Sequence, residues 1–178
     1  MSANVLGRRY AGALLDLGVK NAKADLYGRQ LAAAAEVLGD PAVKKALSSP
    51  LFDAKFKREI IDQAAHELQL SPTVKNFLRL LIDKRRITIL QAITAKYAEL
   101  LDEHNGIARA TVCSAVELDT AALARLRVLL QRKVGRRIEL TAHTDPSVVG
   151  GLRVQVGSKV YDATIASHLR RLREKLKH

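Results

Sequence analysis

The sequence predicts a mainly α protein with a small α+β part: an N-terminal six-helix antiparallel bundle followed by a small strand-helix-strand-strand-helix domain. Two patterns predict this division. Through residues 1–106 apolar residues recur at steps of three and four, which is the spacing of one helical face. After Gly106 apolar and polar residues alternate, as they do in a half-buried strand. We therefore expect one domain over residues 1–106 and a second over residues 107–178.

The core is expected to consist mostly of aliphatic side chains. Of the 178 residues, 48% are apolar, but only 4% are aromatic and none is Trp. A core built from Ala, Leu, Ile and Val suits close-packed helices. The first helix shows the pattern, because its apolar residues share one face: Leu6, Tyr10, Ala13, Leu14 and Leu17.

Six helices are expected in residues 1–106, and three of them have clear starts. A side chain at each start can accept hydrogen bonds from the free backbone N–H groups of the first turn. In two cases the cap precedes a proline, whose fixed φ suits the first helical position. Short connections favour antiparallel neighbours. The caps are Asp40 before Pro41, Asp53, and Ser71 before Pro72, and the sixth helix ends at Asn105-Gly106.

The fifth helix, which begins at Pro72, has an unusually wide apolar surface. Leu80 and Ile82 flank the ordinary core stripe that contains Phe77, so that the apolar arc spans roughly 200°. One interpretation is a helix that is buried more deeply than its neighbours. The other is a second apolar edge that accepts a partner helix. The pattern alone leaves both open.

The glycine-rich run near the C-terminus raises the question of a phosphate-binding loop. Such a loop needs Gly, four residues and then Gly-Lys-Ser or Gly-Lys-Thr before a helix. Here five residues separate Gly151 from Gly157, and Lys159 follows Ser158. The flanking segments "LRVQV" and "KVYD" both read as strands, so the run predicts a tight β-hairpin instead.

Turns and caps account for the other residues of this run. Gly150 and Gly151 are expected to form a bend or bulge where the backbone approaches another strand closely. The pair Asp145-Pro146 is expected to make a turn before them. The last helix should then be capped by Asp162 or Thr164.

Chemical sites are not expected. The five histidines are scattered, and Cys113 has no second cysteine for a metal or a disulfide. The G-x-S-x-G elbow of many hydrolases does not occur. We therefore predict no catalytic residues, no cofactor and no metal site, and a protein that is not an enzyme. The apolar run "ITILQAITA" has nine residues before Lys96, fewer than the roughly 20 of a membrane span.

Positive charge is the dominant surface property. The net charge is +12, and residues 107–178 hold 14 Lys and Arg against 6 Asp and Glu. This excess favours an acidic or anionic partner. The alternative is a charged helix face that is simply solvated. Tyr161 is the only aromatic residue in that half, which weakens the case for nucleic acid. The densest cluster lies in the last helix: Arg170, Arg171, Arg173 and Lys175.

Two segments resemble a known family. The opening "RRYAGALLDL" and a C-terminal motif resemble the δ subunit of F-type ATP synthases, which is similar to the mitochondrial oligomycin-sensitivity-conferring protein. The resemblance covers essentially the whole chain. Two departures are mild, because Thr164 keeps the hydroxyl of the more usual Ser, and a helix end tolerates Gly18 in place of Ala. The motif residues are Asp145, Pro146, Gly150, Gly151, Gly157, Asp162, Thr164, Leu169 and Leu172.

The resemblance implies a stator role at the cytoplasmic face of a bacterial cell membrane, to which the protein is bound only through its complex. One copy per complex would bind the N-terminal helix of an α subunit between its first and fifth helices. The second domain would bind the b subunits of the peripheral stalk. An alternative is a basic two-domain module that binds nucleic acid. The expected α-facing residues are Tyr10, Leu14, Phe77, Leu80 and Ile82, each of which could instead be core, and the expected stalk-facing residues are Arg170, Arg171, Arg173 and Lys175.

Overall fold

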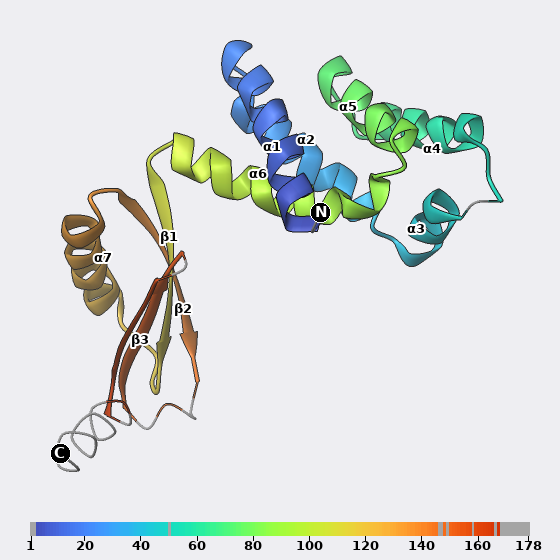
Figure 1. Ribbon diagram of the computed structural model, residues 1–178. Helices are drawn as coiled ribbons and strands as arrows, with labels where there is room; N and C mark the ends of the chain where they lie inside the picture. The colour runs from blue at the N-terminus through green and yellow to red at the C-terminus, as the bar shows by residue number, and fades with distance from the viewer. Residues whose placement is uncertain are drawn as a thin grey trace. The chain divides into compact units, whose positions relative to one another are not determined.

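A computed structural model describes residues 3–49, 51–145, 148, 150–157, 159–165 and 167 of the chain (Figure 1). The described residues form seven α-helices, a short 3-10 helix and one four-stranded sheet, so the mainly helical class with a small sheet is confirmed. The chain divides into two compact units, residues 1–101 and 102–178, and each has its own apolar core.

The first unit contains the expected helix starts. The carboxylate of Asp40 accepts a hydrogen bond from the Ala42 N–H at 2.8 Å, and that of Asp53 accepts one from Phe56 at 2.7 Å. The Ser71 hydroxyl caps the fifth helix. The helices are α1 (Ala3–Lys20), α2 (Ala24–Val37), α3 (Pro41–Ser48), α4 (Ala54–Glu67), α5 (Pro72–Asp83), the 3-10 helix η1 (Ile87–Ile89) and α6 (Leu90–His104).

A buried tyrosine joins three helices of this unit. Tyr97 of α6 is 1% exposed, and its hydroxyl donates a hydrogen bond to the carbonyl oxygen of Ala24 at 2.8 Å, at the start of α2. Burial raises the pKa of Tyr97 to about 12, and the charge of Asp25 adds to the effect. The same ring approaches α1 at Gly18, where an added Cβ would lie 3.1 Å from the Tyr97 hydroxyl and 2.9 Å from the Cα of Ala24.

Gly18 is therefore a packing position rather than a tolerated helix end. It lies inside α1, and any side chain there would push α1 away from α2. The sequence pattern did not reveal this requirement, because the contacts come from residues of other helices.

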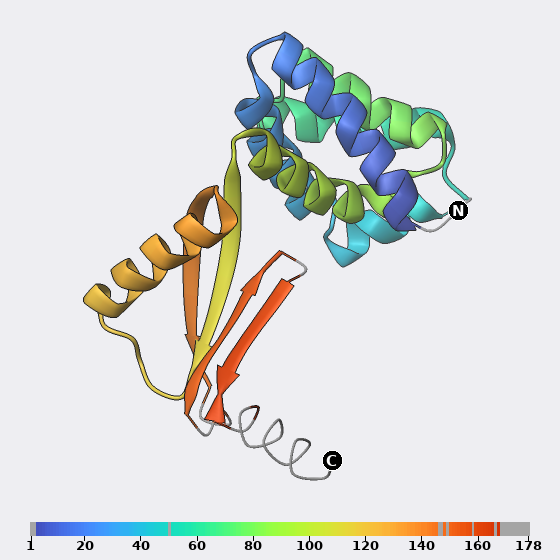
Figure 2. The same cartoon turned by 60° about the vertical axis from the view of Figure 1, so that its left-hand side comes forward.

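The second unit is a sheet covered on one face by a helix (Figure 2). The strand order is β2-β1-β3-β4; β1 and β2 are parallel, and the other neighbours are antiparallel. A parallel pair needs a crossover connection, which α7 supplies. The predicted strand-helix-strand-strand-helix order has one strand too few, because both strands of the hairpin at Gly157 follow β2, and the predicted closing helix lies largely outside the described residues. The elements are β1 (Ile107–Ser114), α7 (Thr120–Val134), β2 (Arg137–Thr144), β3 (Gly151–Val156) and β4 (Lys159–Thr164).

The register decides which residues face α7. Leu130 of α7 packs with Val112 of β1, Ile138 of β2 and Val154 of β3, and all four are buried. Alternate residues of each strand point to the other face. There Thr111, Glu139 and Gln155 are exposed, as is usual for a sheet with one face in water.

Candidate partner-binding surfaces

An aromatic contact joins α1 to α5. The rings of Tyr10 and Phe77 meet edge to face, with their centroids 6.2 Å apart. The Arg86 guanidinium fixes the tyrosine further: it donates a hydrogen bond to the Tyr10 hydroxyl at 2.6 Å, and its carbon lies 5.6 Å from the ring centroid. These contacts place one edge of α1 beside one edge of α5.

The five expected α-facing residues differ in exposure. Leu14, Phe77 and Ile82 are buried in the core of the first unit, at 1%, 9% and 5% exposure. Tyr10 is half-buried and packs against that core. Leu80 is 43% exposed, so the wide apolar surface of α5 is divided: Ile82 lies in the core, whereas Leu80 faces solvent.

Leu17 is a residue that the sequence pattern assigned to the core but the structure exposes. It is 47% exposed. It follows Tyr10 by seven residues, about two helical turns, so it lies on the same side of α1 as the contact with α5. This spacing was visible in the sequence, but only the Tyr10–Phe77 contact shows which side of α1 borders α5. We name Tyr10, Leu17, Phe77 and Leu80 the α1–α5 surface.

The paired glycines near the C-terminus serve close strand packing. Gly151 has φ +84°, and a Cβ there would press into the carbonyl oxygen of Ala163 and lie 2.9 Å from the Cα of Thr164 on β4. Gly150 has φ +129°, and a Cβ there would lie 2.8 Å from the Ile165 side chain. The expectation of a bend with close backbone approach is confirmed.

The hairpin at Gly157 is likewise confirmed. Strands β3 and β4 pair antiparallel from Gly151–Thr164 to Val156–Lys159, and Gly157 has φ +57° in the turn between them. Lys159 is therefore the first residue of a strand rather than a phosphate ligand at the start of a helix.

Asp162 organises the end of β4. One carboxylate oxygen accepts hydrogen bonds from the Thr164 N–H and hydroxyl at 3.0 and 2.7 Å, and the other accepts one from the Ser167 hydroxyl at 2.7 Å. The Thr164 hydroxyl in turn accepts from the Ser167 N–H, as a cap does. The Ser167 and Thr164 donors lower the pKa of Asp162 well below its usual range, and Arg153, 3.7 Å away, adds to the effect.

The remaining motif residues divide between described and undescribed parts of the chain. The N–H of Asp145 donates to the carbonyl oxygen of Ser114 at 2.9 Å, and its own carbonyl accepts from Val148, which closes a turn. Pro146, Leu169 and Leu172 lie outside the described residues. So do the predicted stalk-facing residues Arg170, Arg171, Arg173 and Lys175.

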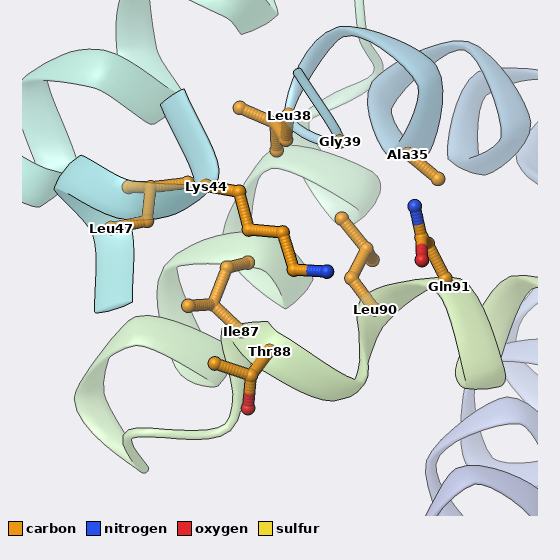
Figure 3. A pocket seen from close by; sticks show the side chains of 9 residues that line it. All are labelled: Ala35, Leu38, Gly39, Lys44, Leu47, Ile87, Thr88, Leu90 and Gln91. Carbon is orange, nitrogen blue, oxygen red and sulfur yellow. The ribbon is translucent and has the colours of Figure 1, made fainter. Parts of the chain in front are cut away.

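A small apolar cavity lies between α2, α3 and the start of α6 (Figure 3). Its volume is about 20 Å³, room for little more than one water. The Lys44 side chain extends across it toward Leu90. Across the described ranges no three His, Cys, Asp or Glu side chains gather as metal ligands. No helix in the part of the chain that the structure covers has the length and apolar character of a membrane span.

These features define a two-unit protein with a helical first unit, a basic sheet-containing second unit and a structural C-terminal motif. The family model for the ATP synthase delta (OSCP) subunit matches residues 6–176. The chain belongs to the ATP synthase delta (OSCP) subunit family. It is accordingly a structural subunit of the peripheral stalk of an F-type ATP synthase and is not itself catalytic.

Relatives match along almost the whole chain. ATP synthase subunit delta of Geobacter metallireducens is 34% identical over 98% of this chain and 97% of its own length. The subunit delta of Solidesulfovibrio magneticus is 37% identical over 99% and 98%. A chain in the cryo-EM structure of the Toxoplasma gondii mitochondrial ATP synthase hexamer shares the fold, with a TM-score of 0.72 at 20% identity and coverage of 97% and 98%.

Proposed function

We propose that this subunit fastens the catalytic head to the b subunits, one copy per complex, so that the head does not turn with the rotor. Residues 1–106 form an antiparallel six-helix bundle seated on the head, and residues 107–178 hold the stalk. The complex keeps the subunit at the cytoplasmic face of the bacterial membrane, and the subunit reaches the membrane only through the complex.

The α1–α5 surface is the proposed site for the N-terminal helix of an α subunit. The observation that carries this assignment is the exposure of Leu17 and Leu80 beside the Tyr10–Phe77 contact. Two large aliphatic side chains in water next to an aromatic pair favour burial by a partner, at about 25 cal/mol for each Å² of apolar surface. An amphipathic helix that lies along both edges meets this need.

The second unit is the proposed stalk-binding unit. Its excess of 14 Lys and Arg over 6 Asp and Glu favours an acidic partner, and Arg170, Arg171, Arg173 and Lys175 remain the proposed contacts. Nucleic acid is the less supported partner, because stacking would require aromatic side chains and Tyr161 is the only one in this half.

Peptide binding tests the head-facing site. Leu17→Asp and Leu80→Asp are expected to weaken binding of an α-subunit N-terminal peptide by roughly tenfold or more, since each change places a charge in an apolar contact. Val37→Asp is the matched control, because Val37 on α2 is 41% exposed and lies outside the α1–α5 surface. Isothermal titration calorimetry measures the affinities. Equal affinities for all four proteins would refute the assignment.

A further inference from the structure

Helix α7 and the turn after it carry positive charge without any internal compensation. Residues 120–138 contain six Lys and Arg and no Asp or Glu. No i, i+4 ion pair can therefore form along the helix to offset the repulsion between these charges. The six cations are Arg125, Arg127, Arg132, Lys133, Arg136 and Arg137.

The outward face of α7 also exposes apolar surface between its arginines. Leu130 faces the sheet and is 6% exposed. At about 100° per residue, Arg125, Val128 and Arg132 point away from it, with Leu129 beside them. Val128 is 45% exposed and Leu129 is 62% exposed. An apolar pair is thus held in water between one arginine a turn before it and another a turn after it.

The fold of the second unit explains only part of this charge. Arg132 and Lys133 lie in the last turn, where a cation interacts favourably with the helix dipole. The Lys133 ammonium also lies 4.1 Å from the centroid of the Tyr161 ring. Arg125 lies earlier in the helix, where the dipole offers no such gain. Neither Arg125 nor Arg127 forms an ion pair with any residue that the structure describes.

A groove of mixed charge lies along the flank of α7 away from Leu129. Arg127 and Gln131 of α7 line an open groove together with Arg137 and Glu139 of the neighbouring edge strand β2. The groove has a volume of about 300 Å³, enough for several partner side chains.

We propose that this outward face of α7 docks an acidic amphipathic helix of the peripheral stalk. Val128 and Leu129 contact an apolar strip on that helix, and Arg125 and Arg132 pair with carboxylates beside the strip. The identity of the partner rests on the proposed function above. The site on α7 is additional to the cations after residue 169.

A helix fits this face better than a lipid surface or RNA. A helix that lies in a membrane buries a broad apolar face, and the broad apolar face of α7 is already packed on the sheet. The apolar surface that α7 leaves exposed is only the pair Val128 and Leu129. A surface this narrow suits the apolar strip of a single helix, whose apolar residues recur three and four apart. The outward face of α7 carries no aromatic side chain on which a base could stack.

The test compares full-length variants that bind the purified soluble b-subunit dimer. Arg125→Glu/Arg132→Glu is expected to weaken binding at least tenfold and to flatten the dependence of affinity on salt, because ion pairs across the interface are lost. Leu129→Ala is expected to weaken binding equally at low and high salt. The controls are Lys45→Glu/Lys55→Glu, which makes the same charge change on exposed residues of the first unit, and Val160→Ala, an exposed residue of β4.

The outcomes separate this inference from the proposed function. If the wild-type chain binds the dimer and the α7 variants bind equally well, the inference is overturned and the stalk-binding role stands. If the wild-type chain does not bind the dimer, both fall. If the α7 variants lose binding to anionic phosphatidylglycerol vesicles or to RNA but keep their affinity for the dimer, the face has another partner and the inference fails.

Discussion

At the scale of single residues, substitutions at Gly151 and Gly157 distinguish the cost of backbone strain from the cost of a steric clash. Both have positive φ, but an added Cβ at Gly157 meets nothing within 4 Å, whereas at Gly151 it meets β4. Gly157→Ala is expected to destabilise the second unit by about 1 kcal/mol, from the left-handed backbone alone. Gly151→Ala should cost about 1–3 kcal/mol more, because the strands must separate.

Hydrogen exchange at the amides of β3 and β4 measures both changes without interference from the first unit. Similar protection in the two variants would show that β3 and β4 have room for a side chain at Gly151.

Asp162 should make the second unit sensitive to acid. Its folded-state pKa is lowered, so ionised Asp162 contributes stability that is fully present above its unfolded pKa of about 4. That contribution is lost as the pH falls below 4 toward the folded pKa. Asp162→Asn lacks the contribution at every pH, so the stability difference from wild type should be constant above about pH 5 and shrink below pH 4.

Denaturant unfolding at a series of pH values, monitored by hydrogen exchange in β4, gives the stability difference between the wild type and Asp162→Asn. A difference that stays constant down to pH 2 would mean that the three hydroxyl and amide donors do not favour the ionised carboxylate.

At the scale of elements, α1 contains a matched pair of glycines. An added Cβ at Gly12 meets nothing within 4 Å, whereas at Gly18 it meets α2 and Tyr97. Gly12→Ala should stabilise the first unit by up to about 1 kcal/mol, from helix propensity. Gly18→Ala gains the same propensity but should destabilise by about 1–3 kcal/mol, through overpacking. Thermal unfolding followed by circular dichroism at 222 nm reports both, and stabilisation by both would contradict the close approach of α1 to α2.

The elements themselves were predictable wherever the deciding contacts are local in sequence. The caps at Asp40 and Asp53 and the hairpin at Gly157 depend on residues two or three positions apart, so the sequence contained the whole signal. Gly18 and Leu17 were misjudged, because their surroundings come from α2, α5 and α6. The α1–α5 surface was only half predictable for the same reason: the apolar arc of α5 was visible, but which part faces solvent depends on its neighbours.

The charge of α7 shows the same limit. The lack of acidic residues over 120–138 was readable in the sequence. What the sequence did not contain was the exposure of Val128 and Leu129 between the arginines, which depends on how α7 lies on the sheet. The prediction of stalk-facing residues was instead placed in the last helix, because the densest cationic cluster of the sequence lies there.

At the scale of the whole molecule, the proposed head-binding and stalk-binding units would strengthen each other. Once one unit is bound, the other is held near its partner at a raised effective concentration, so the pair holds more firmly than either unit alone. Removing the subunit from membranes should therefore abolish ATP-driven proton pumping, while the detached head continues to hydrolyse ATP.

Quenching of a pH-sensitive dye in membrane vesicles measures pumping, and phosphate release measures hydrolysis. Adding back the wild-type chain should restore pumping. Membranes that pump normally after complete removal of the subunit would contradict the stator role.

The inner position of β1 decides how the second unit bears a mechanical load. β1 follows α6 after only Asn105 and Gly106, and it lies between β2 and β3 in the sheet. Tension that enters along β1 acts parallel to the strand, so the backbone hydrogen bonds to both neighbours resist it in shear, all at once. An edge strand would instead separate one hydrogen bond at a time, at a lower force. A connection through such a strand would resist the torque of the rotor less well.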